Sequence, residues 1–179
     1  MTNGLAVILF VVALSVASCS VAPTSAPETS TPAFPQAPSR LELVEASVVM
    51  VVAGDAIDVE IDGQRYRVRY LGVAAPDSVS STEDLLAKQA NRWLVEGQTV
   101  LLEKDVTDSN HLGELLRYVW RYDGIMVNAT LVSVGYAQAD TLEPDVRYSI
   151  FLEELERQAR KYNWGMWGPG TAAIKTRSN

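Results

Sequence analysis

One dipeptide, Asp62-Gly63, constrains the fold of this chain more than any other feature of the sequence. Both residue types accept the positive φ angles of a type I′ turn, so together they favour a two-residue hairpin loop. Before the turn, Ile57, Val59 and Ile61 alternate with acidic residues, which is the period of a half-buried strand. The segment therefore predicts an antiparallel β-hairpin.

This loop sets the register of the hairpin. Two arginines of its second strand face carboxylates across the pair, as Glu60–Arg65 and Asp58–Arg67. Such cross-strand pairs are an ordinary stabilising arrangement. Arg69 differs, because it faces the methyl group of Ala56 and lies diagonally beside Asp55. We interpret Arg69 and Asp55 either as a functional corner for phosphate or metal, or as a simple diagonal ion pair.

The acidic composition restricts the partners of the chain. Residues 41–168 contain 12 Lys and Arg against 21 Asp and Glu, a net charge of −9. Non-specific nucleic-acid affinity comes mainly from neutralising phosphates, so this balance disfavours a general polyanion surface but not a local basic site. The only cysteine is Cys19 and the only histidine is His111. Carboxylates and arginines must therefore carry any chemistry of the folded part.

The N-terminus has the pattern of an export signal. Residues 4–18 are apolar, and they are too few for a comfortable transmembrane span. The sequence Val-Ala-Ser-Cys at 16–19 resembles a bacterial lipobox, in which Cys19 would be lipidated. A plain secretory signal or an N-terminal anchor helix remains open. Each version predicts an exported or membrane-facing protein, attached in the lipoprotein version to the cell surface or the periplasmic side.

The rest of the chain divides into three parts. Residues 20–40 are rich in Pro, Ser, Thr and Ala, and such a segment cannot bury enough apolar surface to offset its ordering entropy. We interpret it as a disordered tether between a signal peptide at 1–19 and a folded domain at 41–168. Residues 169–179 are expected to form a flexible tail.

Within the domain, five strands and three helices are expected. The strands are predicted at 41–52, in the two arms of the hairpin, at 99–104 and at 114–122. A first helix is predicted to start at a Ser80–Glu83 capping box and to stop at Gly97. A short helix follows at 127–137, and Pro144 is placed just inside the last helix. This order predicts a mainly β, α+β domain, a five-stranded OB-type β-barrel with three helices.

These residues resemble the staphylococcal nuclease family of thermonuclease-like domains. The resemblance rests on the order and spacing of several segments: Gly54-Asp55, 66–73, 75–77, 113–119, 123–124 with 127–128, 131–132 with 135–137, 159–160 and 165–167. It implies the family's five-stranded OB barrel. It also implies Ca²⁺-dependent hydrolysis of phosphodiesters in DNA and RNA, in which two aspartates and a backbone carbonyl help hold Ca²⁺. A glutamate serves the attacking water, and two arginines clamp the phosphate.

Only part of that apparatus carries over. Asp55 matches one metal-binding aspartate, Arg69 matches the first arginine, and the carbonyl of Ala75 keeps the backbone ligand. The second metal carboxylate is replaced by Ala74. Losing one of two carboxylates lowers Ca²⁺ affinity steeply, so we expect Ca²⁺ binding to be weak or absent.

The catalytic positions differ further from the family's residues. Asp77 stands where the family has glutamate, shorter by one methylene, and is either a residual base or a turn cap. Glu114 stands where the second arginine follows a glycine, and is either a functional acid or, as we expect, a solvated strand residue. Removing one transition-state donor costs on the order of 10²–10³ in rate. Arg117 is a poor substitute, because on a strand it points away from the side of Glu114.

Other residues have plain structural interpretations. The tryptophans could stack bases, but core packing and helix docking account for them better: Trp93, Trp120, Trp164 and Trp167. The basic residues of the last helix are expected to pair with its glutamates: Arg157, Arg160 and Lys161 with Glu153, Glu154 and Glu156. His111 is expected to be solvated rather than a ligand.

Three hypotheses follow. The first is an exported, lipid-anchored nuclease-like barrel with an eroded site that serves as a binding module, its partners the membrane through Cys19 and an unidentified protein. The second is an active Ca²⁺-dependent nuclease or phosphodiesterase that uses Asp55, Arg69 and Asp77 and binds nucleic acid. The third is a structural barrel without a ligand.

Overall fold

The computed structural model describes residues 33–39, 43–76 and 81–169. All of them belong to one compact unit, Pro32–Asn179. This unit contains the closed barrel, the described helices and the described hydrophobic core. It therefore has what a domain needs to fold without residues 1–31. Cys19 and Asp77 lie outside the described residues, so the predictions made for them remain predictions.

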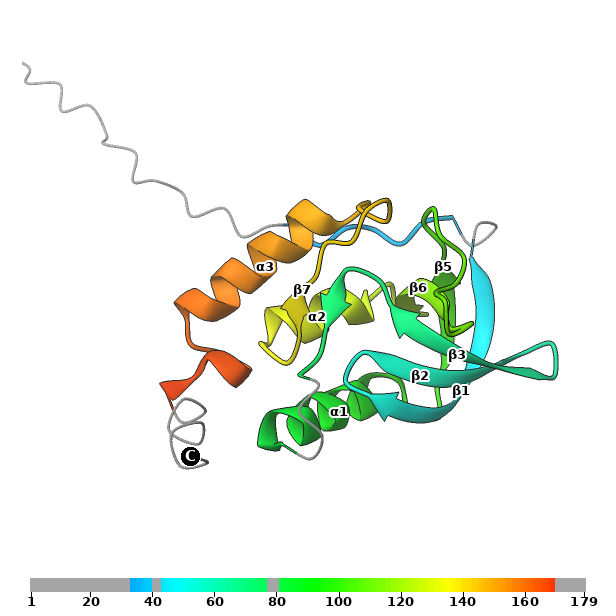
Figure 1. The fold of residues 1–179 in the computed structure, drawn as a ribbon, viewed down its shortest axis with the longest axis horizontal. Coiled ribbons are helices and arrows are strands. Elements are labelled where there is room, and N and C mark those ends of the chain that lie inside the picture. The colour runs from blue at the N-terminus through cyan, green and yellow to red at the C-terminus, as the bar shows by residue number, and fades with distance from the viewer. Residues whose placement is uncertain (1–32, 40–42, 77–80, 170–179) are drawn as a thin grey trace, which may run out of the picture. The chain divides into compact units, whose positions relative to one another are not determined.

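Five strands close a barrel in the order β1-β2-β3-β6-β5, as expected from the sequence (Figure 1). Their bounds are β1 Val44–Ala53, β2 Ala56–Ile61, β3 Gln64–Tyr70, β5 Thr99–Glu103 and β6 Leu115–Arg121. Neighbouring strands are antiparallel except β3 and β6, which are parallel and close the barrel. Two short strands that the sequence did not predict, β4 (Val73–Ala74) and β7 (Gln138–Ala139), pair beside it.

The hairpin forms as predicted. Asp62 and Gly63 have φ angles of 51° and 78°, the positive values that the turn needs. The observed register pairs Ala56 with Arg69, and the two carboxylate–arginine pairs also match. The turn therefore sets which residue Arg69 faces across the hairpin.

Three α-helices flank the barrel: α1 Thr82–Val95, α2 Val127–Ser133 and α3 Ser149–Lys161, with a 3₁₀ turn η2 at Gly165–Trp167 (Figure 1). The side chain of Ser81 caps α1 by accepting from the amide of Asp84 at 3.1 Å, so the predicted Ser80–Glu83 cap was wrong by one residue. Helix α2 is shorter than predicted. The chain turns at Gly135, whose φ is +76°, and a Cβ there would lie 2.2 Å from the Trp164 carbonyl oxygen.

Pro144 does not start the last helix, contrary to the prediction. The reason is Asp145, which is buried and accepts from the amides of Val106 and Thr107 at 2.9 and 2.8 Å. These bonds hold the chain before Ser149 in turns against the end of β5. The backbone reaches a helical path only once that attachment is complete.

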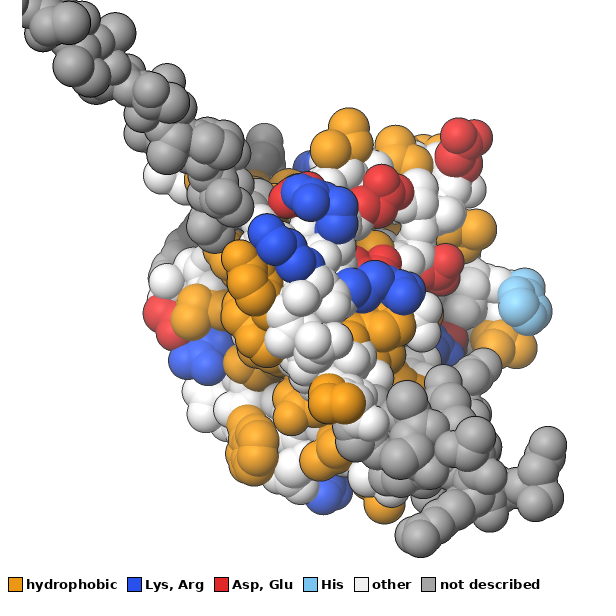
Figure 2. Space-filling model, turned by 90° about the vertical axis from the view of Figure 1, so that its left-hand side faces the viewer, with side chains coloured by type: hydrophobic (Ala, Val, Ile, Leu, Met, Phe, Trp, Pro, Cys, Tyr) orange, Lys and Arg blue, Asp and Glu red, His pale blue; other side chains and the backbone are white. Residues whose placement is uncertain are grey.

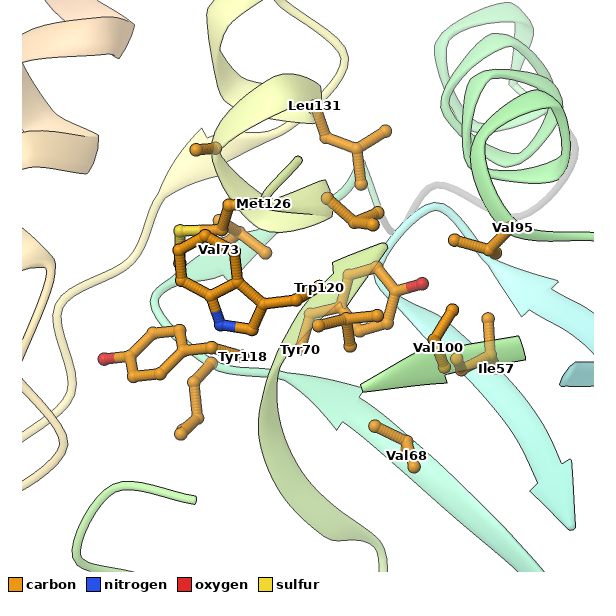
Figure 3. Close-up of a cluster of buried hydrophobic side chains, with 14 of the residues drawn as sticks. Ile57, Val68, Tyr70, Val73, Val95, Val100, Tyr118, Trp120, Met126 and Leu131 are labelled. Atoms are coloured by element: carbon orange, nitrogen blue, oxygen red, sulfur yellow. The ribbon is translucent and has the colours of Figure 1, made fainter. Parts of the chain in front are cut away.

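The core fills the barrel and its junction with α2 (Figure 3). Trp120 and Tyr118 of β6 are fully buried, with Met126 of the α2 N-terminus beside Trp120, while Ile57 of the hairpin lies on the other side of the cluster next to Val100. The prediction that all four tryptophans serve packing holds for Trp120 but not for Trp93, which is exposed on α1. Among the described residues, no helix is long and apolar enough to cross a membrane.

Candidate functional site

The candidate site lies where β1 turns into β2. Asp55 occupies this turn and is only 5% exposed. The Nη1 atom of Arg69 donates to both of its carboxylate oxygens at 3.0 Å. The backbone N–H of Ala75 also donates to Oδ2 at 3.1 Å. The diagonal Asp55–Arg69 contact predicted from the register is therefore present, and both oxygens of Asp55 are engaged.

Glu114 reaches the same place from a different part of the chain. It precedes β6 and is 9% exposed, so the expectation of a solvated strand residue was wrong. Asn110 explains its position. The Oδ1 atom of Asn110 accepts from the amides of Leu112 and Glu114 at 3.0 Å, and its Nδ2 donates to Glu114 Oε2 at 2.7 Å. This turn holds the Glu114 carboxylate in one orientation.

We call Asp55, Arg69 and Glu114 the carboxylate–arginine corner. Arg69 Nε lies 3.6 Å from Glu114 Oε2, while Nη1 holds Asp55. The Arg69 side chain is 42% exposed, whereas both carboxylates are largely buried. These three side chains alone carry a net negative charge, although Arg67 on the same strand also interacts electrostatically with Glu114. With both carboxylates in place, the three side chains together disfavour a phosphate.

Helix α1 supports the corner from behind. Its buried residue Asn91 donates to the carbonyl of Ala53 at 2.9 Å and accepts from the hydroxyl of Tyr70 at 2.9 Å. Burial raises the pKa of the Tyr70 hydroxyl, which stays a protonated donor at neutral pH. These bonds tie the ends of β1 and β3 to the helix, so Asp55 and Arg69 start from a rigid backbone.

Position 54 requires glycine because its neighbours leave no room for a side chain, not because of its backbone angles. A Cβ on it would lie 2.7 Å from the Cβ atoms of Ala75 and Ala87. We expect Gly54→Ala to lower the free energy of unfolding by about 1–3 kcal/mol, because overpacking forces α1 away from the turn. Gly63→Ala is the control, since Gly63 has free space around it and only its positive φ opposes a side chain. Urea unfolding measures both losses. The loss for Gly63→Ala reports the φ penalty alone, and a Gly54→Ala variant as stable as the unaltered domain would contradict the crowding.

The remaining predicted residues lie as follows. Ala74 is in β4 and brings no carboxylate, and the observed contact of Ala75 with Asp55 is through its N–H. Arg117 is directed away from the corner, as predicted. Its guanidinium bonds Asp108, and this lowers the pKa of the Asp108 carboxyl. His111 is exposed, and the basic residues Arg157 and Arg160 pair with Glu154 and Glu156, both as predicted.

The carboxylate oxygens of the described corner residues, as they are arranged, do not fit a Ca²⁺ ion. Calcium takes six to eight oxygen ligands. At the corner, Asp55 already accepts from Arg69 and Ala75, and Glu114 already accepts from Asn110. Within the described ranges, no three Asp, Glu, His or Cys side chains converge on a point. An ion would have to displace Arg69 before it could use Asp55.

Two supporting residues escaped the sequence analysis. Asn91 could have been noticed as one polar residue among the buried Ala87, Ala90 and Val95 of α1. Asn110 lies three residues before Gly113, in a polar loop, where an asparagine commonly bonds its own backbone. Neither signal connects these residues to the corner. Asn91 supports it through Ala53 and Tyr70, and Asn110 through Glu114, and only the folded barrel brings these parts of the chain together.

The fold and the site together define a class. A five-stranded closed barrel of OB type, flanked by three helices and carrying an acidic and a basic side chain at the β1–β2 corner, is the architecture of nuclease-like barrel domains. The family model of staphylococcal nuclease homologues matches residues 67–169. The chain belongs to this family.

Relatives agree with this assignment. Over 125 residues the chain is 33% identical to a protein named thermonuclease from Staphylococcus intermedius, covering 67% of this chain and 74% of that protein. It is 30% identical over 142 residues to endonuclease YncB of Bacillus subtilis (strain 168), covering 74% and 66%. Over 139 residues it is 31% identical to protein ParB of Escherichia coli, covering 73% and 76%.

Proposed function

We propose that this chain is an exported, lipid-anchored member of the family whose barrel works as a binding module and hydrolyses phosphodiesters very weakly or not at all. One observation carries the proposal. Arg69 is held between Asp55 and Glu114, with its Nη1 at 3.0 Å from the first and its Nε at 3.6 Å from the second. The arginine expected to meet a phosphate already has two anionic partners.

The surface charge supports the same proposal. The chain carries a net charge of −7 at neutral pH. On the face shown in Figure 2, basic side chains are interspersed with acidic and hydrophobic ones and form no continuous basic area. A site that binds along the sugar-phosphate backbone of a nucleic acid needs a continuous basic area, because neutralising the phosphates supplies most of its affinity. Any nucleic-acid binding by this face is expected to be weak.

Export and lipid attachment are proposed from the sequence alone. The apolar run at 4–18, the small residues before Cys19 and the Pro-rich segment at 20–40 have the order of a lipoprotein signal followed by a tether. In this proposal the barrel is held at the cell envelope through Cys19. Metabolic labelling with a palmitate analogue, with Cys19→Ser as the control, tests this part separately.

A second candidate is a weak Ca²⁺-dependent phosphodiesterase that uses Asp55, Arg69 and Asp77. The retained Asp55–Arg69 contact favours it, as do relatives named thermonuclease and endonuclease. In that candidate, Ca²⁺ or substrate must first break the ion pairs of Arg69. Asp77 would then have to place a water despite its shorter side chain, and an error near 1 Å costs about 10²-fold in rate.

The deciding experiment is hydrolysis of single-stranded DNA by the purified unit of residues 32–179, with millimolar Ca²⁺ and with chelator. We expect no cleavage above that of an Asp55→Ala variant under either condition, because the metal and phosphate positions are occupied by internal contacts. Calcium-dependent cleavage that disappears in Asp55→Ala would overturn the proposal and establish the second candidate.

A further inference from the structure

The C-terminal end of α3 carries two half-exposed aromatic side chains, Tyr162 and Trp164, which we call the aromatic pair. They are 50% and 48% exposed, and their rings stack with centroids 5.3 Å apart. The Nζ atom of Lys161 lies 5.2 Å from the centroid of the Tyr162 ring. In Figure 1 this end of α3 lies with η2 on the left-hand side of the domain, the side that Figure 2 shows. Exposed apolar side chains that lie together commonly mark an interaction surface.

The backbone holds the aromatic pair in place. Asn163 has a φ of 56°, which ends α3, and the amide of Trp164 donates back to the carbonyl of Ala159 at 2.9 Å. The amide of Met166 then donates to the carbonyl of Gly135, just after α2, at 2.8 Å. The aromatic pair is therefore presented by a backbone that is bonded to two helices. It needs little ordering before it can bind a partner.

This end of the chain is basic, although the chain as a whole is acidic. Residues 156–179 contain five Lys and Arg and one Glu, a net charge of +4, whereas residues 1–155 contain ten Lys and Arg and 21 Asp and Glu, a net charge of −11. Three of the five basic residues stand just before the aromatic pair: Arg157, Arg160 and Lys161. Figure 2 shows basic side chains beside hydrophobic ones on this face. Such an asymmetry of charge favours an anionic partner surface.

The anionic surface that fits best is a lipid bilayer. Arg157 and Arg160 are bound to glutamates of the same helix, at 2.5 and 2.6 Å, so they are poorly placed to follow the phosphates of a nucleic acid. A base needs a free ring face on which to stack, and each ring of the aromatic pair already gives one face to the other. A bilayer interface requires neither. Trp and Tyr enter the headgroup region because their rings have an apolar body and a polar edge.

The N-terminal part of the chain joins the domain on the same helix. Phe34 packs edge to face on Phe151 of α3, with ring centroids 5.4 Å apart. Cys19 precedes Phe34 by 15 residues, which span at most about 50 Å. If Cys19 is lipidated as proposed above, the barrel stays within that distance of the membrane. At the resulting effective concentration, even a weak second contact with the bilayer is sufficient to orient the domain.

We propose that the aromatic pair and Lys161 form a membrane-docking surface, which enters the headgroup region of an anionic bilayer. The two rings supply the apolar area, and the ammonium group of Lys161 lies among the lipid phosphates. The end of α3 then faces the membrane. The inference goes beyond the proposed function and depends neither on lipid attachment nor on the state of the nuclease site, because residues 32–179 can be tested without Cys19.

Co-sedimentation of residues 32–179 with vesicles of phosphatidylcholine and phosphatidylglycerol in equal parts measures the docking. We expect Trp164→Ser to lower the partition coefficient at least about tenfold, because the indole supplies much of the apolar area that leaves water. The matched control is Trp93→Ser, which removes the same side chain from an exposed site on α1 and should leave partitioning unchanged. Emission from Trp164 should shift to shorter wavelength on binding. This shift should persist in Trp93→Ser and disappear in Trp164→Ser.

Lys161 tests the electrostatic part of the docking. Lys161→Gln should lower partitioning about fivefold on these vesicles, and much less on vesicles of phosphatidylcholine alone, because only the former carry a negative surface potential. Lys88→Gln, which removes the same charge from α1, should have a much smaller effect on both.

Urea unfolding checks that each variant is folded, and Tyr162→Ser, which should act in the same direction, replaces Trp164→Ser if that variant is unfolded. An unaltered domain that does not bind vesicles would overturn the proposal. So would an equal loss with Trp93→Ser, or normal partitioning of Trp164→Ser. Binding of a single-stranded oligonucleotide that depends on Trp164, without binding of vesicles, would assign the surface to nucleic acid instead.

Discussion

Replacing Glu103 with alanine is expected to lower the free energy of unfolding by about 2–4 kcal/mol. Glu103 is 2% exposed at the end of β5, and its carboxylate accepts from Trp120 Nε1 at 2.7 Å and from Arg147 Nη1 at 2.6 Å. The hydroxyl of Tyr148 lies 3.2 Å from both of its oxygens. Without the carboxylate, the fully buried indole N–H of Trp120 has no acceptor and a void opens beside it.

The partners of Glu103 separate the sources of this loss. Arg147 is about half exposed, so water screens part of its ion pairs with Glu103 and Asp105, and Trp120 and Tyr148 still donate to Glu103 in its absence. We therefore expect Arg147→Ala to cost about 1–2 kcal/mol, less than Glu103→Ala. Glu103→Gln keeps the volume and an acceptor for Trp120, so its loss should fall between the two. Urea unfolding followed by far-ultraviolet circular dichroism measures all three. A loss for Arg147→Ala equal to that for Glu103→Ala would show that the ion pair, not the buried acceptor, dominates.

Changing positions 74, 77 and 114 back to the family's residues is expected to raise Ca²⁺-dependent DNA hydrolysis by at least about 10³-fold. The variant combines Ala74→Asp, Asp77→Glu and Glu114→Arg. The first change supplies a second carboxylate, the second lengthens the residue that serves the water, and the third replaces the anion beside Arg69 by a cation. Single changes should do much less, because residues that act as one unit are not additive.

The restored variant needs two controls. Adding Asp55→Ala to it should remove the gained activity, since Asp55 is the retained carboxylate of the corner. A thermal unfolding scan must show that the variant is folded, because Arg69 and a new arginine at position 114 repel each other without an anion between them. A folded variant with no gain would mean that these three positions are not sufficient for hydrolysis.

The fold was largely predictable because its main determinants are local. The Asp62-Gly63 turn sets its own φ angles, and the register of β2 and β3 follows from it, down to the position of Arg69 beside Asp55. Helix ends were less predictable. Pro144 was placed in α3 on a local preference, but the buried attachment of Asp145 to the residues after β5 prevailed.

The candidate site was predictable only in part. The substitutions at 74 and 114 could be seen in the sequence, but the position of the Glu114 side chain could not. It is held by Asn110 and turned toward Arg69, which comes from a separate strand. Likewise, the tie of Asn91 to Ala53 joins residues 38 positions apart. Such contacts depend on the closure of the barrel, and no local pattern records them.

By itself, then, the sequence determined the hairpin, its register, the family motifs and the acidic balance, because each depends on the order and type of neighbouring residues. The tertiary structure alone decided which charges from separate segments meet. It placed Arg69 between two shielded carboxylates and Glu103 under Trp120, and it left Trp93 outside the core. Burial and distance control the strength of an ion pair or a hydrogen bond, and both arise only when distant segments pack together.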